Sequence, residues 1–227
     1  MAAQVDTIRP SQGDGEGHDG HTTGPRRRGR GKYDRSLSTE ERHGRQRRAI
    51  VMGLAQLLDT AGPLGVSVSA VLSHALISRA TFYQHFADTA AVVSALEQLA
   101  EQKLVQPVAR ATRDAVTPVS TLRAQCQAWF DALQSEPLLA RSTLTQRYGG
   151  HLGGRVVKAL AQALNPTLQS AHLARAVARR PNEVHLDLAA QVLFVLGLAS
   201  APSEPAAAND PDERTALAVD LILRLLR

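Results

Sequence analysis

The decapeptide at residues 77–86, Ile-Ser-Arg-Ala-Thr-Phe-Tyr-Gln-His-Phe, carries the most specific chemical pattern in the chain. Ser78 can cap a helix with its hydroxyl oxygen. Phe82 and Phe86 are four residues apart, so on such a helix they share one face and can pack inward with Ile77. The pattern predicts a short helix whose apolar side is held by a core.

Polar side chains occupy the rest of that helix. A guanidinium such as Arg79 can bind O6 and N7 of guanine, whereas Tyr83 and His85 are suited to phosphate oxygens. The polar face of this helix is therefore suited to contact with duplex DNA. The alternative is an amphipathic helix with a solvated face, because short motifs also occur by chance.

The segment at residues 65–75 predicts another short helix, which Ser67 can cap. Its apolar side chains recur at helical spacing, and they are Val68, Val71, Leu72 and Ala75. Leu76-Ile77 then makes a tight break. Two short helices joined in this way form a helix-turn-helix pattern, in which the second helix offers its N-terminal side chains to the major groove.

Longer helices are predicted on both sides of this motif. Residues 42–61 form one helix, which Gly62 and Pro63 end, with an apolar stripe of Ile50, Leu54, Leu57, Leu58 and Ala61. Asp88 opens the next helix, which carries Val92, Val93, Leu96, Leu99 and Leu104. This order of a long helix, two short helices and a further long helix predicts a three-helix head joined to a connecting helix.

Over about residues 45–100 the chain resembles the tetracycline-repressor (TetR) family of bacterial transcription regulators. The resemblance is carried by residues 48–58, by Ser67-Val68 and Val71, and above all by residues 78–86. It implies a dimeric DNA-binding regulator, most often a repressor, that binds a palindromic operator and responds to a small molecule. The head residues expected at the DNA are Arg48, Ser67, Ser78, Arg79, Ala80, Thr81, Tyr83, Gln84, His85 and Thr89.

Two positions depart from the family pattern. The turn position that usually holds glycine is Leu76, and a leucine disfavours positive φ, which predicts a rebuilt turn. Thr89 stands where the family usually places a lysine, and it supplies no charge to a phosphate. The alternative function is therefore a degenerate member, a helical small-molecule-binding or protein-interaction module with weak DNA binding.

The positive charge is concentrated immediately before and on the first helix of the head. Residues 26–48 hold ten Lys or Arg against three acids, a net charge of +7, so the rest of the +5 chain carries −2. We expect residues 1–40 to be a largely disordered arm, with the head at 41–87 and an effector-binding and dimerisation domain at 88–227. The arm residues expected to follow phosphates are Arg26, Arg27, Arg28, Arg30 and Lys32. The alternative is a solubilising tail.

The second domain is predicted to be entirely helical. Its helices are expected near residues 89–113, 119–134, 137–147, 155–164, 167–180, 183–200 and 212–227. Pro107 should kink or break the first of them. Five other prolines lie near predicted helix starts, and these are Pro118, Pro137, Pro166, Pro181 and Pro211.

The last two helices are apolar around most of their circumference, which predicts a partner beyond the domain's own core. By resemblance, they pair with their twofold mates in a dimer. The residues expected at that interface are Leu188, Val192, Val195, Leu196, Leu217, Leu221 and Leu225. The alternative is that both helices are central to the monomer core.

The sequence offers little for catalysis. It has no H-E-x-x-H pair and no G-x-S-x-G elbow, and its single Cys126 lies in an apolar helical stripe typical of a packed thiol. No cofactor or metal is expected, and the absence of a membrane span or export signal favours the cytoplasm. An effector of unknown identity is expected against Leu104, Trp129, Phe130, Leu133 and Tyr148, which are equally ordinary core residues.

Overall fold

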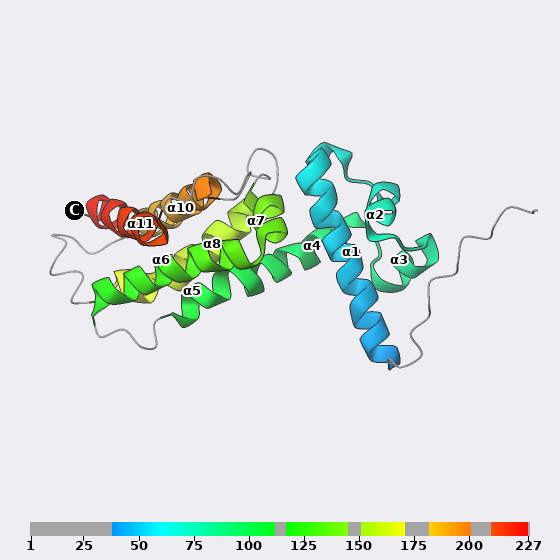
Figure 1. Ribbon diagram of the computed structural model, residues 1–227, viewed down its shortest axis with the longest axis horizontal. Coiled ribbons are helices and arrows are strands. Elements are labelled where there is room, and N and C mark those ends of the chain that lie inside the picture. Colours follow the sequence, from blue (N-terminus) through cyan, green and yellow to red (C-terminus); the bar gives the residue numbers. More distant parts are fainter. Residues whose placement is uncertain (1–37, 112–116, 145–150, 171–181, 201–209, 227) are drawn as a thin grey trace, which may run out of the picture. The chain divides into compact units, whose positions relative to one another are not determined.

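The computed structural model describes residues 38–111, 117–144, 151–170, 182–200 and 210–226. Regular structure in these residues is helical throughout, which confirms the all-α prediction (Figure 1). None of the described helices is long and apolar enough to cross a membrane. The arm residues Arg26 to Lys32 and Tyr148 lie outside the described residues.

The head consists of α1 (Thr39–Ala61), a 3-10 turn (Pro63–Gly65), α2 (Val68–Ala75) and α3 (Arg79–His85). α1 begins three residues before the predicted start, so residues 38–40 are not part of a disordered arm. The cause is a capping box. The Ser38 hydroxyl accepts from the Glu41 backbone N–H at 3.1 Å, and the Ser38 N–H donates to Glu41 Oε2 at 2.9 Å.

The predicted inward faces of the head helices are buried together. Ile50 and Leu54 of α1, Val71 of α2, and Phe82 and Phe86 at α3 are all at most 4% exposed. The caps predicted for α2 and α3 are also confirmed. Ser67 Oγ accepts from the Ala70 N–H at 3.2 Å and Ser78 Oγ from the Thr81 N–H at 3.1 Å.

The turn between α2 and α3 keeps the left-handed conformation that glycine usually provides. Leu76 has φ 54° and ψ 41°, and its N–H donates to the Leu72 carbonyl as the cap of α2. The prediction of a rebuilt turn was therefore wrong. A leucine in this region costs about 1–2 kcal/mol, and the 90% exposure of its side chain offsets none of that by burial.

The body begins with α4 (Thr89–Ala100), which runs into a π-helical turn (Glu101–Val105) and α5 (Gln106–Arg110). The predicted interruption near Pro107 is confirmed, because α4 ends at Ala100 and a π-helical turn separates it from α5, of which Pro107 is the second residue. The remaining helices are α6 (Pro118–Ser135), α7 (Pro137–Leu144), α8 (His151–Leu168), α10 (Glu183–Ser200) and α11 (Pro211–Leu225). Proline opens α6, α7 and α11, as predicted.

One predicted boundary in the body was wrong. A break between helices at 155–164 and 167–180 was expected, but α8 continues through Pro166 to Leu168. Residues 171–180 of the second predicted helix and Pro181 lie outside the described residues. Pro166 is exposed, while Leu164 and Leu168 on either side are fully buried. Burial of these two leucines therefore outweighs the hydrogen bond that a proline removes near the end of a helix.

α6 lies at the centre of the body and contacts α5, α8, α10 and α11. The indole N–H of Trp129 donates to the Leu193 carbonyl of α10 at 3.0 Å. A Cβ on Gly197 would lie 2.8 Å from both Trp129 Nε1 and Leu133 Cδ1. α10 can approach α6 this closely only because residue 197 has no side chain.

Candidate nucleic-acid interface

α3 exposes most of the side chains that were predicted to contact DNA. Arg79, Ala80, Tyr83 and Gln84 are exposed. Thr81 is half-buried, and its hydroxyl lies 2.8 Å from Ser78 Oγ. The helix therefore has one face anchored in the head and one polar face toward solvent.

Arg79 is positioned by a residue that the sequence did not single out. Its Nη2 donates to Ser69 Oγ of α2 at 3.2 Å, which joins the two helices of the motif on their outer side. Ser69 is exposed in the first turn of α2, as is the Ser67 that caps it. The Ser69 hydroxyl and the Arg79 guanidinium therefore form one polar surface.

His85 sits in a different environment from the rest of α3. Its Nε2 lies 3.0 Å from Gln46 Oε1 of α1, and its ring packs edge-on against His43 with centroids 4.8 Å apart. Burial lowers the pKa of His85, and the neighbouring charges of His43 and Arg47 lower it further. A phosphate contact from His85 would have to displace or share the bond to Gln46.

The remaining head positions lie around α3. Arg48 is exposed on α1, and the Arg47 guanidinium lies 4.5 Å from the ring centroid of Phe86. Thr89 is the first residue of α4 and is half-buried, beside the Asp88 carboxylate that caps α4 through the Ala91 N–H at 2.8 Å. The cation that the family pattern supplies here is absent, and an acid caps the helix.

A bidentate ion pair ties the head to the body. Arg141 of α7 donates to both carboxylate oxygens of Asp59 of α1, with three N–O distances of 3.1–3.2 Å. Both side chains are partly buried. A pair of this geometry fixes orientation as well as distance at the contact between α7 and α1.

The four described residues expected against an effector fill the interior. Leu104, Trp129, Phe130 and Leu133 are at most 2% exposed, in agreement with the core role that was their alternative. Two surface hollows of about 520 Å³ each are lined by other residues. One lies between α5 and α6, and the other between α8 and α10.

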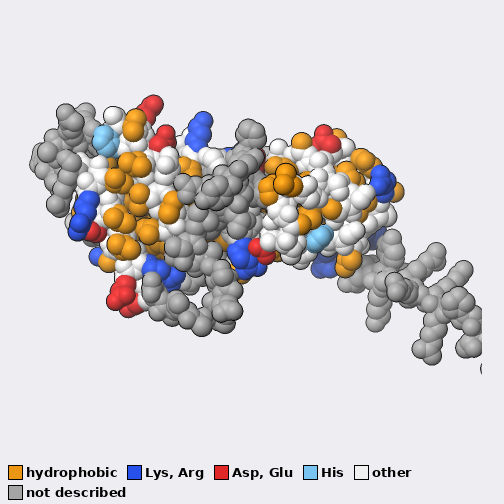
Figure 2. Space-filling model, turned by 90° about the horizontal axis from the view of Figure 1, so that it is seen from above, with side chains coloured by type: hydrophobic (Ala, Val, Ile, Leu, Met, Phe, Trp, Pro, Cys, Tyr) orange, Lys and Arg blue, Asp and Glu red, His pale blue; other side chains and the backbone are white. Residues whose placement is uncertain are grey.

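α10 and α11 each bury one face and expose another that is also apolar. Leu193 and Phe194 of α10 and Ile222 of α11 are buried within the body, whereas Val184 of α10 is 70% exposed. Figure 2 shows hydrophobic side chains gathered over this part of the surface. The predicted dimer residues Leu188, Val195 and Leu217 are exposed, and Val192, Leu196, Leu221 and Leu225 are half-buried.

The single cysteine of the chain lies in the core of the body. Cys126 is fully buried, as predicted, and burial raises the pKa of its thiol to about 12. A thiol in that environment is not a nucleophile near neutral pH. Among the described residues, no three His, Cys, Asp or Glu side chains gather as metal ligands would.

Comparison with known proteins identifies the fold. No protein-family model and no curated protein matches the sequence. Among solved structures, a TetR-family transcription regulator from Marinobacter aquaeolei is similar, with a TM-score of 0.63, 16% identity, and coverage of 82% of this chain and 98% of that one. The chain has the TetR-family fold.

Two further structures give the same result. A bacterial regulatory protein of the TetR family from Rhodococcus has a TM-score of 0.61 at 14% identity, over 80% of this chain and 96% of that one. The TetR-family regulator PfmR from Thermus thermophilus has a TM-score of 0.54 at 21% identity, over 77% of this chain and 97% of that one. At these identities the TetR-fold likeness concerns architecture, so residue roles depend on this chain's own geometry.

Proposed function

We propose that this TetR-fold chain is a transcription regulator that binds duplex DNA through α3. The observation that carries the proposal is the division of α3 into two faces. Phe82 is buried in the head, while Arg79, Tyr83 and Gln84 are exposed together. A helix with one face buried in the head and polar side chains along its exposed face suits the major groove. Arg79 would read a guanine, and Tyr83 would donate to a phosphate.

The regulator would act as a homodimer. The exposed apolar faces of α10 and α11 support this, since an unpartnered face of this kind favours association. A twofold dimer presents two copies of α3 and matches an inverted repeat with half-site centres about 34 Å apart, or a multiple of that distance. We expect a repressor that acts in the cytoplasm and is released by a small-molecule effector.

The Asp59–Arg141 ion pair offers a physical link between effector and operator. An effector that binds more tightly to one arrangement of the body shifts the population toward it. Because Arg141 is bonded to α1 through Asp59, that shift would reach the head and change the spacing of the two α3 helices.

The test is selection of bound fragments from genomic DNA, followed by titration of the recovered site. We expect an inverted repeat. Arg79→Ala should cost about 1–3 kcal/mol at one base pair and relax the preference there. Arg123→Ala, an exposed arginine of α6, is the control and should leave binding unchanged. Binding no tighter than to random DNA would contradict the proposal.

The second candidate is a helical binding module with weak DNA affinity, which the uncharged Thr89 favours. Thr89→Lys separates the two functions. In a regulator it should tighten binding to every sequence and steepen the dependence of log K on log salt by about one unit. If the parent and Thr89→Lys proteins both fail to bind DNA at low salt, the module is the better description.

The basic arm would add phosphate contacts. Deletion of residues 1–37, which spares the Ser38 cap of α1, should lower DNA affinity and flatten its salt dependence. An unchanged salt dependence would make the arm a solubilising tail.

A further inference from the structure

Arg79 of α3 differs from arginines such as Arg141 and Arg155 in the charge of its partner. Arg141 and Arg155 each pair with a carboxylate of another helix, at 3.1 and 3.3 Å, so their charges are balanced within the fold. The Nη2 of Arg79 instead donates to the Ser69 hydroxyl at 3.2 Å, and no ion pair in the described part of the chain includes Arg79. A hydroxyl accepts this bond without cancelling the charge, so the cation stays available to a partner outside the chain.

Both ends of the Arg79–Ser69 bond start from a fixed backbone. Ser69 lies in the first turn of α2, where the Ser67 hydroxyl caps the helix. Arg79 is the first residue of α3, where the Ser78 hydroxyl does the same. The turn between the two helices is closed by the N–H of Leu76, which donates to a carbonyl of α2. The bond therefore holds the guanidinium beside the first turn of α2.

An arginine that reads a base benefits from being held in this way. An exposed arginine samples many rotamers, and that freedom is lost when the side chain binds. Contact with guanine requires two N–H groups of one plane, directed at O6 and N7. Ser69 accepts from one donor of the guanidinium and leaves the others for the base. The bond thus orders the side chain before DNA arrives and keeps most of its donors free.

We propose that Ser69 is a positioning residue for base recognition by Arg79, and that it sets the preference for guanine through the orientation of that guanidinium. The inference rests on the proposed function, because it requires that α3 enter the major groove. A serine suits this position on chemical grounds. An alanine here would release the guanidinium, and an aspartate would hold it but balance its charge.

The DNA test uses the full chain and two duplexes. One is the selected operator, and the other has a different base pair at the position where Arg79→Ala relaxes the preference. Ser69→Ala should weaken binding to the operator about threefold to tenfold, the range of one hydrogen bond, and leave binding to the altered duplex unchanged. Ser69→Thr keeps the hydroxyl and should restore the preference. Ser73→Ala is the matched control, since Ser73 is an exposed serine of α2 whose hydroxyl bonds only to backbone.

A double-mutant cycle separates positioning from the other roles that a serine can have. If Ser69 acts through Arg79, then Ser69→Ala should have no further effect in the Arg79→Ala protein. A direct phosphate contact from Ser69, or a contribution of Ser69 to the stability of α2, predicts the same loss in both backgrounds and on both duplexes. That result would overturn the proposal.

A measurement without DNA tests the positioning itself. In ¹⁵N relaxation of the arginine side chains, the Arg79 Nε–H signal is the one missing from the Arg79→Lys protein. Its order parameter should fall in Ser69→Ala and be kept in Ser69→Thr. An order parameter that Ser69→Ala leaves unchanged would overturn the positioning role, whatever the DNA result. If Ser69→Ala lowers it but the parent protein binds no DNA, the result counts against the proposed function alone.

Discussion

Two close helix contacts show how differently the head and the body are built. In the head, a Cβ on Gly53 of α1 would lie 2.8 Å from both Cβ and the backbone nitrogen of Ala75. In the body, a Cβ on Gly197 of α10 would lie 2.8 Å from the ends of two side chains, Trp129 and Leu133. At the head contact the nearest atoms include backbone, whereas at the body contact the nearest atoms all belong to side chains.

The largest effect on stability is expected for Trp129, at the contact between α6 and α10. Trp129→Ala should lower the free energy of unfolding by about 3–5 kcal/mol, because it removes a fully buried indole and its bond to the Leu193 carbonyl. Trp129→Phe should cost less, since it keeps most of the volume. Urea denaturation followed by circular dichroism measures both. Equal losses for the two variants would mean that the hydrogen bond, and not the packing, holds α10.

Alanine substitutions of Gly53 and Gly197 test this comparison of head and body directly. Gly53→Ala should destabilise the protein by about 1–3 kcal/mol, because Ala75 presents backbone that cannot rotate away. Gly197→Ala should cost less, because its methyl meets side-chain atoms only: Leu133 Cδ1 can change rotamer, and the Trp129 indole has to shift. Thermal denaturation of the two variants gives the order. A larger loss for Gly197→Ala would reverse the assignment of the rigid and adjustable regions.

A smaller effect, of opposite sign, is expected at the turn of the head. Leu76→Gly should raise stability by up to about 1 kcal/mol, because relief of the left-handed strain exceeds the added entropy of the unfolded chain. Leu64→Gly is the matched control, since Leu64 is also fully exposed but has no positive φ. It should be neutral or destabilising. Stabilisation by both substitutions would point to loss of exposed apolar surface as the cause.

The head was largely predictable because its determinants are local. Each determinant depends only on spacing within its own short helix: the cap Ser67 for α2, and the cap Ser78 with the inward pair Phe82 and Phe86 for α3. What sequence reasoning missed there was also local. Ser38-x-x-Glu41 is a capping-box pattern, and it would have placed the start of α1 correctly.

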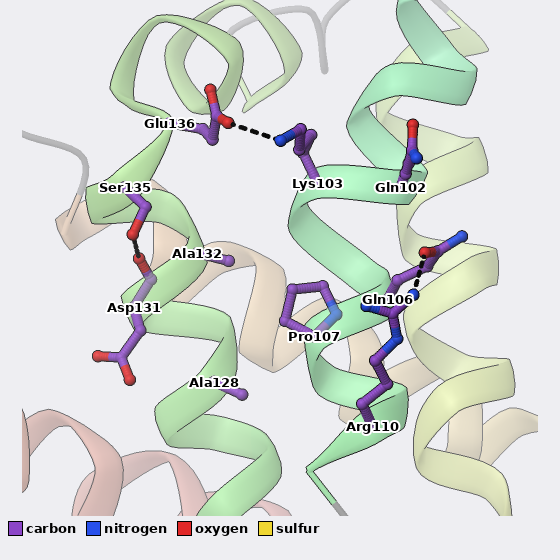
Figure 3. Close-up of a pocket in the computed structure, with 10 residues that line it drawn as sticks. All are labelled: Gln102, Lys103, Gln106, Pro107, Arg110, Ala128, Asp131, Ala132, Ser135 and Glu136. Carbon is purple, nitrogen blue, oxygen red and sulfur yellow. Dashed lines mark hydrogen bonds and ion pairs between the residues drawn. The ribbon is translucent and has the colours of Figure 1, made fainter.

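The body was predictable as a set of helices but not as an assembly. The Trp129–Leu193 bond joins residues 64 apart, and the Asp59–Arg141 pair joins residues 82 apart. No periodicity of a single helix encodes which partners meet over such separations. Sequence reasoning also missed the hollow between α5 and α6. Ala128 and Ala132 of α6 line it (Figure 3), and alanine is common in any helix, so these residues do not mark a hollow in the sequence.

The smallest expected effect is a difference between the head and the body in how their stability depends on pH. Burial lowers the pKa of His85, so the folded head favours the neutral ring. The unfolded chain takes up that proton first as the pH falls below about 6.5. The contribution of His85 to stability is therefore complete above that pH and decreases below it, as the depressed folded-state pKa is approached.

His85→Gln should reduce the loss of stability between about pH 7.5 and about pH 5.5, because its amide does not titrate. His185→Gln on α10 is the control in the body and should leave the pH dependence of the head unchanged. The protein contains one tryptophan, Trp129, so its fluorescence reports the body while circular dichroism reports both regions. In the parent protein, the circular dichroism midpoint in urea should fall with pH more than the fluorescence midpoint does. If the two midpoints moved together and His85→Gln changed neither, the head and the body would unfold as one unit and the bond between His85 and Gln46 would contribute nothing measurable to the pH dependence.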